Sequence, residues 1–536
     1  MNKIVLNGRD LTVDQLVSVT REFTPVEIES GCRANIIKVR QWIEDHWMTP
    51  EAPPIYGFTT GLGKLKDTRI SPEQNEQFQL NIIKSHSGQV GDPLPEEVVR
   101  AAMLVRVNLF CRGVCGLRME TVDRLLEMIN RRVHPVVPTL GTVGCSGDLG
   151  PLAHIVGAMI GLEKAEAIFE GQRLPARQAL EKAGMSPTFE LKAKDALSLV
   201  NGTTVFAAYA ALNIHDAYAV ARMADITGAL SLEAMRGEWG AFDDRYQEVG
   251  NHPGQATVAA NVLKLVRNST RTSEEARRVH LKNDITHPTY NPRVQDLLSL
   301  RCIPQVHGAV RDNLDYAASI IEKELNAVTD NPLVFWNEKG GLDFVSGGNS
   351  HGEPIGFAMD ILAMSLTELG NIAERRLFAI CDPCLSYGIP PMLAGEPAGL
   401  NCGYAVISCS AAAITSENKT MCFPSTADSL TTKSSQEDHV SMAPWATRKA
   451  RHILKNLEKI LGIETLIATQ AISLTEKELP GFKLGDGTGA VYSRVKQDFP
   501  GTEKDEYMPD QSGACIRLVE KRQILKAAES AVGSLS

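Results

Sequence analysis

The sequence predicts a mainly α-helical protein organised around several very long helices. Apolar residues recur at the three- and four-residue spacing of a buried helix face over long stretches of the chain. Alternation of apolar and polar residues, which is typical of strands, is short and rare. The chain has 536 residues, of which 43% are hydrophobic and 22% charged, so it is long enough to bury a large core.

The predicted helices are longer than the average of about 11 residues in globular proteins. Two short hairpins are expected beside them, Ile4 to Asn7 with Leu11 to Val13, and Leu333 to Trp336 with Phe344 to Ser346. Long helices with so few strands predict a long-helix bundle. The predicted helices cover Glu97 to Asn130, Val205 to Ala234, Val306 to Asn326, Phe357 to Ile380 and Thr447 to Ala471.

Proline and glycine punctuation divides the chain into three expected parts. A loop-rich N-terminal lobe covers residues 1–204 and a central long-helix bundle covers 205–480. A smaller C-terminal cap covers 481–536, where the chain becomes richer in Gly, Lys and Asp.

Composition and charge exclude several classes of function. The net charge of -9 provides no basic stripe that could neutralise phosphates, so we expect no nucleic-acid partner. The N-terminus lacks the apolar core of a signal peptide. Two uncharged runs, Ala196 to Ile214 and Gly399 to Ser416, hold Asn, Gly, Ser and Thr inside them. We expect them to be helices buried inside a large protein or an assembly and not membrane spans.

Cysteine usage favours a reducing compartment. The eleven cysteines are odd in number and lack the regular spacing of a disulfide scaffold, so we expect a cytoplasmic protein. Cys381 and Cys384 form a CxxC, but no second pair with zinc-ligand spacing accompanies them. The sequence therefore predicts no metal site.

The stretch GTVGCSGDLGPLAHI, residues 141–155, places small residues and glycines before an apolar run. Its simplest interpretation is a turn followed by a helix cap, because Ser, Gly and Asp favour both. The stretch also closely resembles the active-site loop of the aromatic amino acid ammonia-lyase and aminomutase family, which includes the histidine ammonia-lyases. In that family a small residue followed by Ser-Gly cyclises into the electrophile 4-methylidene-imidazol-5-one (MIO).

The resemblance implies an MIO formed autocatalytically from Cys145-Ser146-Gly147, and a helical bundle of the fumarase and aspartase type with this loop on its N-terminal lobe. In the cyclisation the amide nitrogen of Gly147 attacks the carbonyl carbon of Cys145. Loss of water, including the Ser146 hydroxyl, then leaves an exocyclic methylene. Only the backbone of residue 145 enters the ring, so Cys is permitted where Ala is most frequent, whereas a Cβ at residue 147 would obstruct the nitrogen.

Such an electrophile makes the elimination of ammonia from an amino acid easier. Eliminating ammonia from an α-amino acid requires the removal of a weakly acidic β-proton and the departure of a poor leaving group. A covalent electrophile that captures the amine makes it leave more readily.

Further motifs follow in the family's order over about residues 50–480. Tyr56 in IYGFTTGLG matches the tyrosine proposed as the base for the β-proton, and Asn201 in LVNGTT matches a motif that borders the electrophile. Arg301 in VQDLLSLRCIPQ matches the arginine that binds the substrate carboxylate. The resemblance extends substrate binding to Gln295 in the same segment and to Asn349 in SGGNSHGEP.

Three features favour histidine as the substrate. His86 in NIIKSHSG and Glu417 in AAAITSENK match positions that line the substrate pocket in histidine lyases, and Glu417 would meet the imidazole or assist the leaving amine. The stretch SSQEDHVSMAP, residues 434–444, is closer to the histidine-lyase pattern than to the phenylalanine and tyrosine one. A polar imidazole needs such hydrogen-bonding partners. The expected reaction is deamination of L-histidine, or of a close imidazole or aromatic analogue, to a urocanate-like acid.

Three positions depart from the family pattern: Leu298 replaces a tyrosine, Ser350 replaces a phenylalanine, and Lys64 stands where a small or apolar residue is usual. These departures keep alternatives open. An ergothionase-like enzyme would eliminate trimethylamine from a histidine betaine and could use Lys64 or Arg301 to bind its carboxylate. A 2,3-aminomutase would use the same electrophile, and a catalytically silent homologue would keep only the fold.

The resemblance also implies an assembly. Family members are homotetramers in which each active site collects residues from three chains. The uncharged helices at Val205 to Ile214 and Leu400 to Thr415 are surfaces that such a bundle would bury. The expected partners are therefore a small amino acid substrate and further copies of the chain.

Overall fold

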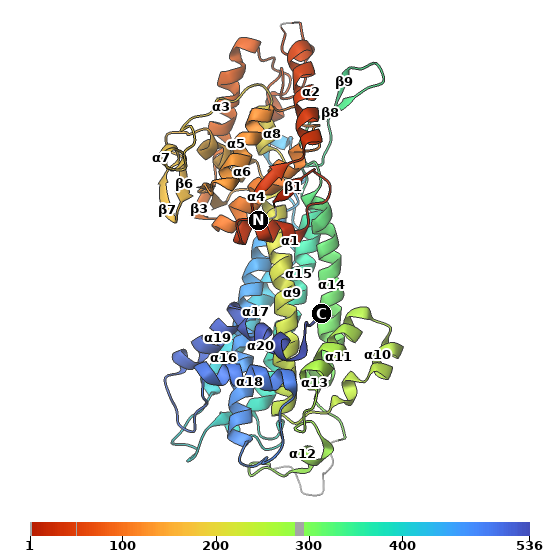
Figure 1. Cartoon of the computed structure of the whole chain (residues 1–536), viewed down its shortest axis with the longest axis vertical. Helices are drawn as coiled ribbons and strands as arrows, with labels where there is room; N and C mark the ends of the chain where they lie inside the picture. The colour runs from red at the N-terminus through yellow and green to blue at the C-terminus, as the bar shows by residue number, and fades with distance from the viewer. Residues whose placement is uncertain (1–2, 50, 285–293) are drawn as a thin grey trace. The chain divides into compact units, whose positions relative to one another are not determined.

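The computed structural model describes residues 3–49, 51–284 and 294–536 of the chain (Figure 1). Contacts between residues group the chain into two units, each assembled from three separate segments. The division into residues 1–204, 205–480 and 481–536 stays a prediction about how the chain is organised. Unit 1 comprises Met1–His215, Ala317–Asp360 and Pro424–Arg448, and unit 2 comprises Asp216–Tyr316, Ile361–Phe423 and Lys449–Ser536.

Four helices carry most of the long apolar repeats, and each contains a boundary between the two units. Their residues satisfy all inner backbone hydrogen bonds locally, which is why apolar periodicity alone predicts them. The predicted fold class, mainly α with very long helices, is confirmed. These helices are α9 (Thr204–Ala234), α14 (Ile303–Leu325), α15 (Glu353–Cys381) and α17 (Ala443–Thr475).

Within the described residues, α15 alone is long and apolar enough to cross a membrane by length and composition. In the structure, 72% of its apolar window is buried. The core helix of a protein in water has the same character, so length and composition are weak grounds for a membrane span.

Unit 1 is built around α4 (Glu96–Phe110), in which nearly every residue is buried. The helices α1 (Val13–Arg21) and α5 (Met119–Asn130) pack against it. The single helix predicted over Glu97 to Asn130 is therefore wrong, because the structure has two. The turn between them requires a positive φ at Gly116, where a Cβ would lie 2.9 Å from the ring of Phe58.

A second layer of unit 1 positions the loop at residues 141–148. The helix α6 (Leu149–Met159), which follows this loop, packs on α3 (Asn75–His86) and α8 (Asp195–Val200). Unit 1 also contains α2 (Ser30–Trp47), α7 (Ala176–Lys182), η1 (Gly63–Leu65), η2 (Pro72–Gln74) and η5 (Lys433–Ser435).

The strands of unit 1 are short. The predicted hairpin at the N-terminus is wrong: β1 (Ile4–Leu6) pairs in parallel with β2 (Val26–Ile28). The expected second arm instead begins α1, because Thr12 and Gln15 form a capping box at the start of that helix. Two further sheets are antiparallel: β3 (Val90–Pro93) pairs with β5 (Pro138–Leu140), and β6 (Glu166–Phe169) lies between β4 (His134–Pro135) and β7 (Gln172–Pro175).

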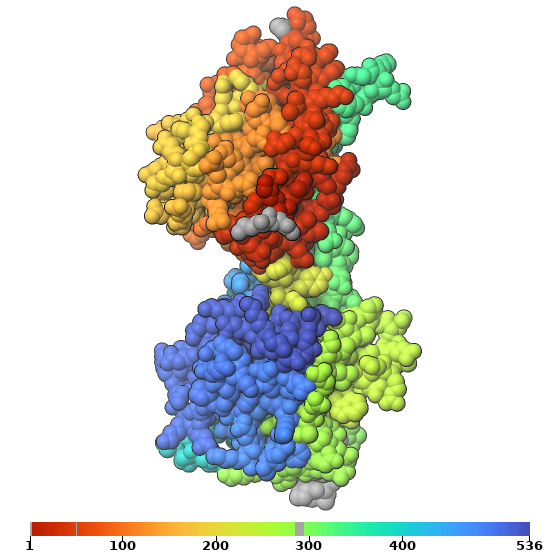
Figure 2. All heavy atoms as spheres, viewed as in Figure 1, coloured from red at the N-terminus to blue at the C-terminus, as the bar shows by residue number. Residues whose placement is uncertain are grey.

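The second predicted hairpin is confirmed. Strands β8 (Leu333–Trp336) and β9 (Leu342–Val345) pair antiparallel, and Figure 2 shows the hairpin projecting from the surface of unit 1. Val334, near the base of the hairpin, donates its N–H to the Val114 carbonyl, and Trp336, next to the turn, makes an edge contact with Trp42.

Unit 2 contains a buried network of charged side chains on its long helices. Asp225 of α9 accepts hydrogen bonds from His307 and Arg311 of α14, and Arg376 of α15 pairs with Glu464 of α17 at 2.6 Å. Removing one member would leave an unpaired buried charge. The remaining elements are η3 (Trp239–Phe242), α10 (Asp244–Gly250), α11 (Pro253–Leu265), α12 (Glu274–Arg278), α13 (Leu298–Arg301), η4 (Pro391–Leu393), α16 (Ala405–Met421), α18 (Asp486–Asp498), α19 (Met508–Glu520) and α20 (Gln523–Val532).

Candidate active site

The loop that carries Cys145-Ser146-Gly147 is seated against the residues before α9. Gly147 and Gly202 form an isolated parallel bridge, and the N–H of Asp148 donates to the Gly202 carbonyl at 2.7 Å. The φ of Gly147 is +72°, and a Cβ there would lie 2.1 Å from the Gly202 oxygen. Residue 147 therefore has to be glycine on two independent grounds, its backbone conformation and the close approach of Gly202.

Asp148 fixes this loop to α9. It stands at the N-cap position of α6 but makes no side-chain hydrogen bond to that helix. Its Oδ2 instead accepts the N–H groups of Val205 at 2.7 Å and Phe206 at 3.3 Å, in the first turn of α9. The simple interpretation of the stretch as a turn with a local helix cap is corrected accordingly, because the side chain caps a different helix. Burial raises the pKa of Asp148, and the two backbone donors oppose that rise.

Asn201 is held by a buried ion pair behind the loop. Lys194 Nζ lies 2.8 Å from Asp330 Oδ2, and both side chains are fully buried. The Nδ2 of Asn201 donates to Asp330 Oδ1 and to the Asn331 carbonyl, each at 3.3 Å. Because both amide hydrogens are used there, Oδ1 is the atom of Asn201 that can meet a ligand.

The carboxylate of Glu437 faces the triplet directly. It accepts hydrogen bonds from the Ser146 hydroxyl on Oε1 and from the Cys145 thiol on Oε2. Glu437 lies in the segment between η5 and α17, and its backbone closes a turn with Thr432. The three residues of η5 all have positive φ, a sparsely populated conformation for residues other than glycine that clusters at functional sites.

Lys433 sets the charge state of this carboxylate. Its Nζ lies 2.8 Å from Glu437 Oε1. Burial raises the pKa of Glu437, but hydrogen bonds from Cys145, Lys433 and Ser146 outweigh burial and lower the pKa below its usual value. Burial and the neighbouring Glu437 raise the pKa of the Cys145 thiol. At neutral pH the site therefore holds an ionised Glu437 beside a neutral thiol and a neutral hydroxyl.

Tyr56 lies half-buried near the same carboxylate. Its Oη accepts the N–H of Gly63 at 3.0 Å. Burial raises the pKa of Tyr56, the Gly63 N–H partly offsets that rise, and the negative charges of Glu437 and Asp330 add to it. The phenol is thus protonated at neutral pH and becomes a strong base once it ionises.

His86 ends α3 with a defined tautomer. Its Nδ1 lies 2.8 Å from the Ile82 carbonyl oxygen, which can only accept, so Nδ1 carries the hydrogen. Burial lowers the pKa of His86 more than this carbonyl raises it, and Lys433 lowers it further. The neutral ring therefore presents Nε2 as an acceptor.

The other predicted residues of unit 1 lie at its surface. Lys64 is exposed on η1, next to the glycine that bonds Tyr56. Asn349 is exposed and donates to the Val328 carbonyl at 3.1 Å, whereas Ser350 beside it is buried. In unit 1 the structure therefore brings the triplet, Tyr56 and His86 into the electrostatic range of Glu437.

The remaining predicted residues belong to unit 2. Arg301 lies at the end of α13, and its Nε is buried with no hydrogen-bond partner in the part of the chain that the structure describes. Gln295 and Leu298 are exposed. Glu417 is exposed on α16, where His452 donates to it at 2.7 Å and lowers its pKa. These residues belong to a different unit from the triplet, so their roles stay predictions.

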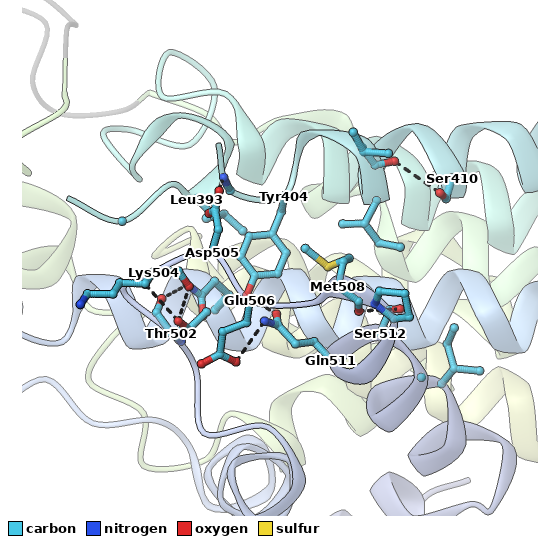
Figure 3. Close-up of a pocket in the computed structure, with 18 residues that line it drawn as sticks. Leu393, Tyr404, Ser410, Thr502, Lys504, Asp505, Glu506, Met508, Gln511 and Ser512 are labelled. Atoms are coloured by element: carbon cyan, nitrogen blue, oxygen red, sulfur yellow. Dashed lines mark hydrogen bonds between the residues drawn. The ribbon is translucent and has the colours of Figure 1, made fainter. Parts of the chain in front are cut away.

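Unit 2 also holds a cavity of about 560 Å³ lined by α16, α19 and the loops beside them (Figure 3). Inside it the hydroxyl of Tyr404 donates to Gln511 at 2.6 Å. The described lining includes none of the predicted site residues. The candidate active site is therefore the group around the triplet in unit 1.

Sequence reasoning missed Glu437 and Lys433. Glu437 stands inside SSQEDHVSMAP, which the family resemblance had already marked as a whole. The sequence gives no reason to distinguish Glu437 from an ordinary solvated acidic residue in a polar segment. Only the fold brings Glu437 into contact with Ser146, 291 residues away along the chain. The role of Asp148 was missed for the same reason.

The chain matches known proteins over nearly its whole length. A family model described as aromatic amino acid lyase matches residues 11–497. The chain belongs to the aromatic amino acid lyase family. A curated histidine ammonia-lyase from Caldanaerobacter subterraneus subsp. tengcongensis is 42% identical over 524 residues, which cover 98% of each chain. The predicted family and the predicted class of carbon-nitrogen lyase are confirmed.

Solved structures of lyases and aminomutases have the same fold as this chain. The crystal structure of histidine ammonia-lyase from Trypanosoma cruzi is 35% identical, with a TM-score of 0.86 over 99% of this chain and 96% of that one. Tyrosine aminomutase from Streptomyces globisporus is 31% identical, with a TM-score of 0.91 over all of both chains. The fold is therefore shared by lyases and aminomutases.

Proposed function

We propose that this lyase deaminates L-histidine, or a close imidazole analogue, to a urocanate-like unsaturated acid and ammonia. The proposal rests on one observation above all: the Ser146 hydroxyl meets the Glu437 carboxylate in a loop that only a glycine at residue 147 can occupy. The 42% identity to a curated histidine ammonia-lyase supports the choice of substrate.

The loop residues fit the formation of MIO from Cys145-Ser146-Gly147. No Cβ obstructs the Gly147 nitrogen, and the neighbouring Gly202 leaves no room for one. The Ser146 hydroxyl, which has to gain a proton and leave as water, donates a hydrogen bond to Glu437. This carboxylate therefore lies where it can take up a proton of the triplet and return it to the departing oxygen. Once formed, MIO supplies an electrophilic carbon that captures the substrate amine and makes it a better leaving group.

Glu437 and Tyr56 have separate roles: Glu437 binds the charged amino group of the substrate, and Tyr56 accepts the β-proton. The ionised Glu437 lies at the triplet, where it binds the substrate ammonium by charge-assisted hydrogen bonds and takes the proton that this group loses to become a nucleophilic amine. Tyr56 takes the β-proton at Oη after it ionises. Because burial raises the pKa of Tyr56, we expect the rate to increase with pH across the neutral and alkaline range, and Tyr56→Phe to lose elimination.

Recognition of the imidazole falls to His86. A neutral His86 whose Nδ1 donates to Ile82 offers Nε2 to the single N–H of the substrate ring. A phenyl ring has no hydrogen to give to this acceptor, so the contact selects against phenylalanine. Asn201 Oδ1, Asn349 and Lys64 complete the substrate-binding residues that unit 1 contributes.

We further propose that Gln295, Arg301 and Glu417 reach the site from neighbouring chains of a homotetramer. The buried Nε of Arg301 lacks a partner among the described residues, which suits a guanidinium that receives a substrate carboxylate. Val406 on α16 and Leu400 before it are about 80% exposed, as expected of a surface that another chain covers. The eleven free cysteines support a cytoplasmic location.

A substrate panel tests the proposal. The wild-type protein is incubated with L-histidine, tyrosine, phenylalanine and the trimethylated thiol-histidine, while ultraviolet-absorbing acid, ammonia and trimethylamine are assayed. We expect ammonia and conjugated acid from histidine, and an intact mass short of two waters. Trimethylamine alone would identify an ergothionase-like enzyme, and a β-amino acid would identify an aminomutase. No product from any substrate would identify a silent homologue.

A further inference from the structure

Three side chains with metal-binding atoms converge at the start of α15 in unit 1. His351 Nε2 and His439 Nδ1 lie 3.1 Å apart, and His351 Nδ1 lies 3.8 Å from Glu353 Oε2. One ligand atom from each residue lies within 4.8 Å of the other two. Two separate stretches of chain meet here: Glu353 begins α15 and His351 precedes it by two residues, whereas His439 follows Glu437 by two residues.

One carboxylate oxygen of Glu353 lacks a hydrogen-bond donor among the described residues. This oxygen, Oε2, is buried, and its distance of 3.8 Å to His351 is too long for a hydrogen bond. The dipole of α15 favours an acidic side chain at its first residue, but it provides no donor for this oxygen. An unsatisfied buried carboxylate oxygen is costly, and a cation held beside it would remove that cost.

The donor set is chemically selective. Two imidazoles and one carboxylate leave one open position in the tetrahedral geometry typical of catalytic zinc sites. Bonds to zinc of about 2.0–2.2 Å place neighbouring ligand atoms about 3.3 Å apart. The 3.1 Å between the two imidazole nitrogens is close to that value, and a ligand atom of Glu353 lies within 4.8 Å of one from each histidine. Nitrogen ligands favour Zn²⁺ over Mg²⁺ and Ca²⁺, which prefer oxygen.

We propose that His351, Glu353 and His439 form a site for a divalent transition metal, Zn²⁺ in the first instance. The site would join the start of α15 to the segment that carries Glu437. The N–H of Gly352 also donates to the Gly144 carbonyl at 3.2 Å, so the α15 side of the site already contacts the loop of the triplet. Bound metal therefore restrains the position of Glu437 relative to Ser146.

A plain hydrogen bond between the two histidines is the competing explanation. The rings stack with centroids 5.2 Å apart, and one neutral ring can donate its N–H to the other. That pair needs no cation and leaves Glu353 Oε2 unsatisfied. Titration with metal separates the two explanations.

The experiment is isothermal titration of the chelator-treated full-length protein with Zn²⁺. We expect one equivalent bound per chain. His351→Gln and His439→Gln should each weaken binding by at least about tenfold, whereas the control His252→Gln, at an exposed histidine outside the group, should not change it. With Co²⁺ in place of Zn²⁺, the visible spectrum should lack a thiolate charge-transfer band, which excludes the eleven cysteines as ligands.

Absence of Zn²⁺ binding, or equal binding by the wild type and both histidine variants, would overturn the proposal. Glu353→Gln keeps the shape of the side chain, so it tests the site even if the histidine variants misfold. It should also weaken Zn²⁺ binding. The same titration with Ser146→Ala, which lacks the leaving hydroxyl, should give wild-type binding. Metal binding can therefore fail or succeed independently of the proposed lyase activity.

Discussion

Gly147→Ala is expected to leave the chain uncyclised and to abolish ammonia release. The residue has a φ of +72°, where a Cβ costs about 1–2 kcal/mol of backbone strain. The Cβ would also lie 2.1 Å from the Gly202 oxygen and 2.3 Å from its carbonyl carbon, far inside the ordinary contact range that begins at 3.4 Å. The loop would have to move by about 1 Å, and a displacement of that size costs about 100-fold in rate.

The assay is intact mass spectrometry alongside ammonia release. The wild type should be short by two waters, whereas Gly147→Ala should have its full mass. Gly171→Ala is a matched control, because Gly171 has nearly the same φ, +74°, but an added Cβ there would meet nothing within 4 Å. This control carries the backbone strain alone, so it should lose two waters and release ammonia at the wild-type rate.

Two results would refute this reasoning. A Gly147→Ala chain that loses two waters and releases ammonia normally would show that contact with Gly202 does not constrain cyclisation. A control variant that is as inactive as Gly147→Ala would show that backbone strain, and not the close approach of Gly202, is responsible.

Three further predictions concern the surroundings of the loop. Lys433→Met removes the cation 2.8 Å from Glu437, so the pKa of Glu437 should rise. The ionised form of Glu437 is then lost at a higher pH, and the acidic limb of kcat/KM should move up by about one pH unit. Lys433→Arg should keep the acidic limb of the wild-type kcat/KM profile. If the acidic limb of Lys433→Met does not move, Lys433 does not lower the pKa of Glu437. His86→Leu should raise KM for histidine at least about tenfold with a smaller effect on kcat, since it removes the Nε2 acceptor and offers no other. An unchanged KM argues against recognition of the substrate by His86. Asp330→Asn leaves Lys194 as an unpaired buried charge and should lower the free energy of unfolding by about 3–5 kcal/mol, as measured by urea denaturation; a loss below about 1 kcal/mol would contradict that expectation.

Local pattern was enough to predict the long helices and one hairpin. Apolar periodicity extends through α9, α14, α15 and α17 without a helix-breaking proline or glycine pair, so tertiary contacts reinforce the local preference. The hairpin of β8 and β9 is likewise formed by strands that are neighbours along the chain.

Prediction failed where a distant segment decides the local structure. The strand β1 pairs with β2 across the whole of α1, and parallel pairing leaves no turn signal in the sequence. The break between α4 and α5 contains Gly116, which has a positive φ and at which Phe58 on another segment leaves no room for a Cβ. Apolar periodicity alone therefore predicted one continuous helix over Glu97 to Asn130.

The candidate site shows the same division. The triplet, Tyr56, His86 and Asn201 could be named from motifs because their chemistry is carried by contiguous sequence. Glu437 could not be singled out, because its importance lies in a contact with Ser146 that arises only from the fold. Arg301, Gln295 and Glu417 belong to unit 2, and their part in the site rests on the proposed homotetramer and not on a contact within the described chain.

Incubation of the wild type and Ser146→Ala with L-histidine tests the central claim most directly. Ammonia and the ultraviolet-absorbing acid are measured in the same samples over time. We predict that the wild type produces both in equal amounts and that Ser146→Ala produces neither, since it lacks the hydroxyl that cyclisation expels. Absence of ammonia and acid in the wild-type reaction, or an equal yield from Ser146→Ala, would contradict histidine deamination by an electrophile made from residues 145–147.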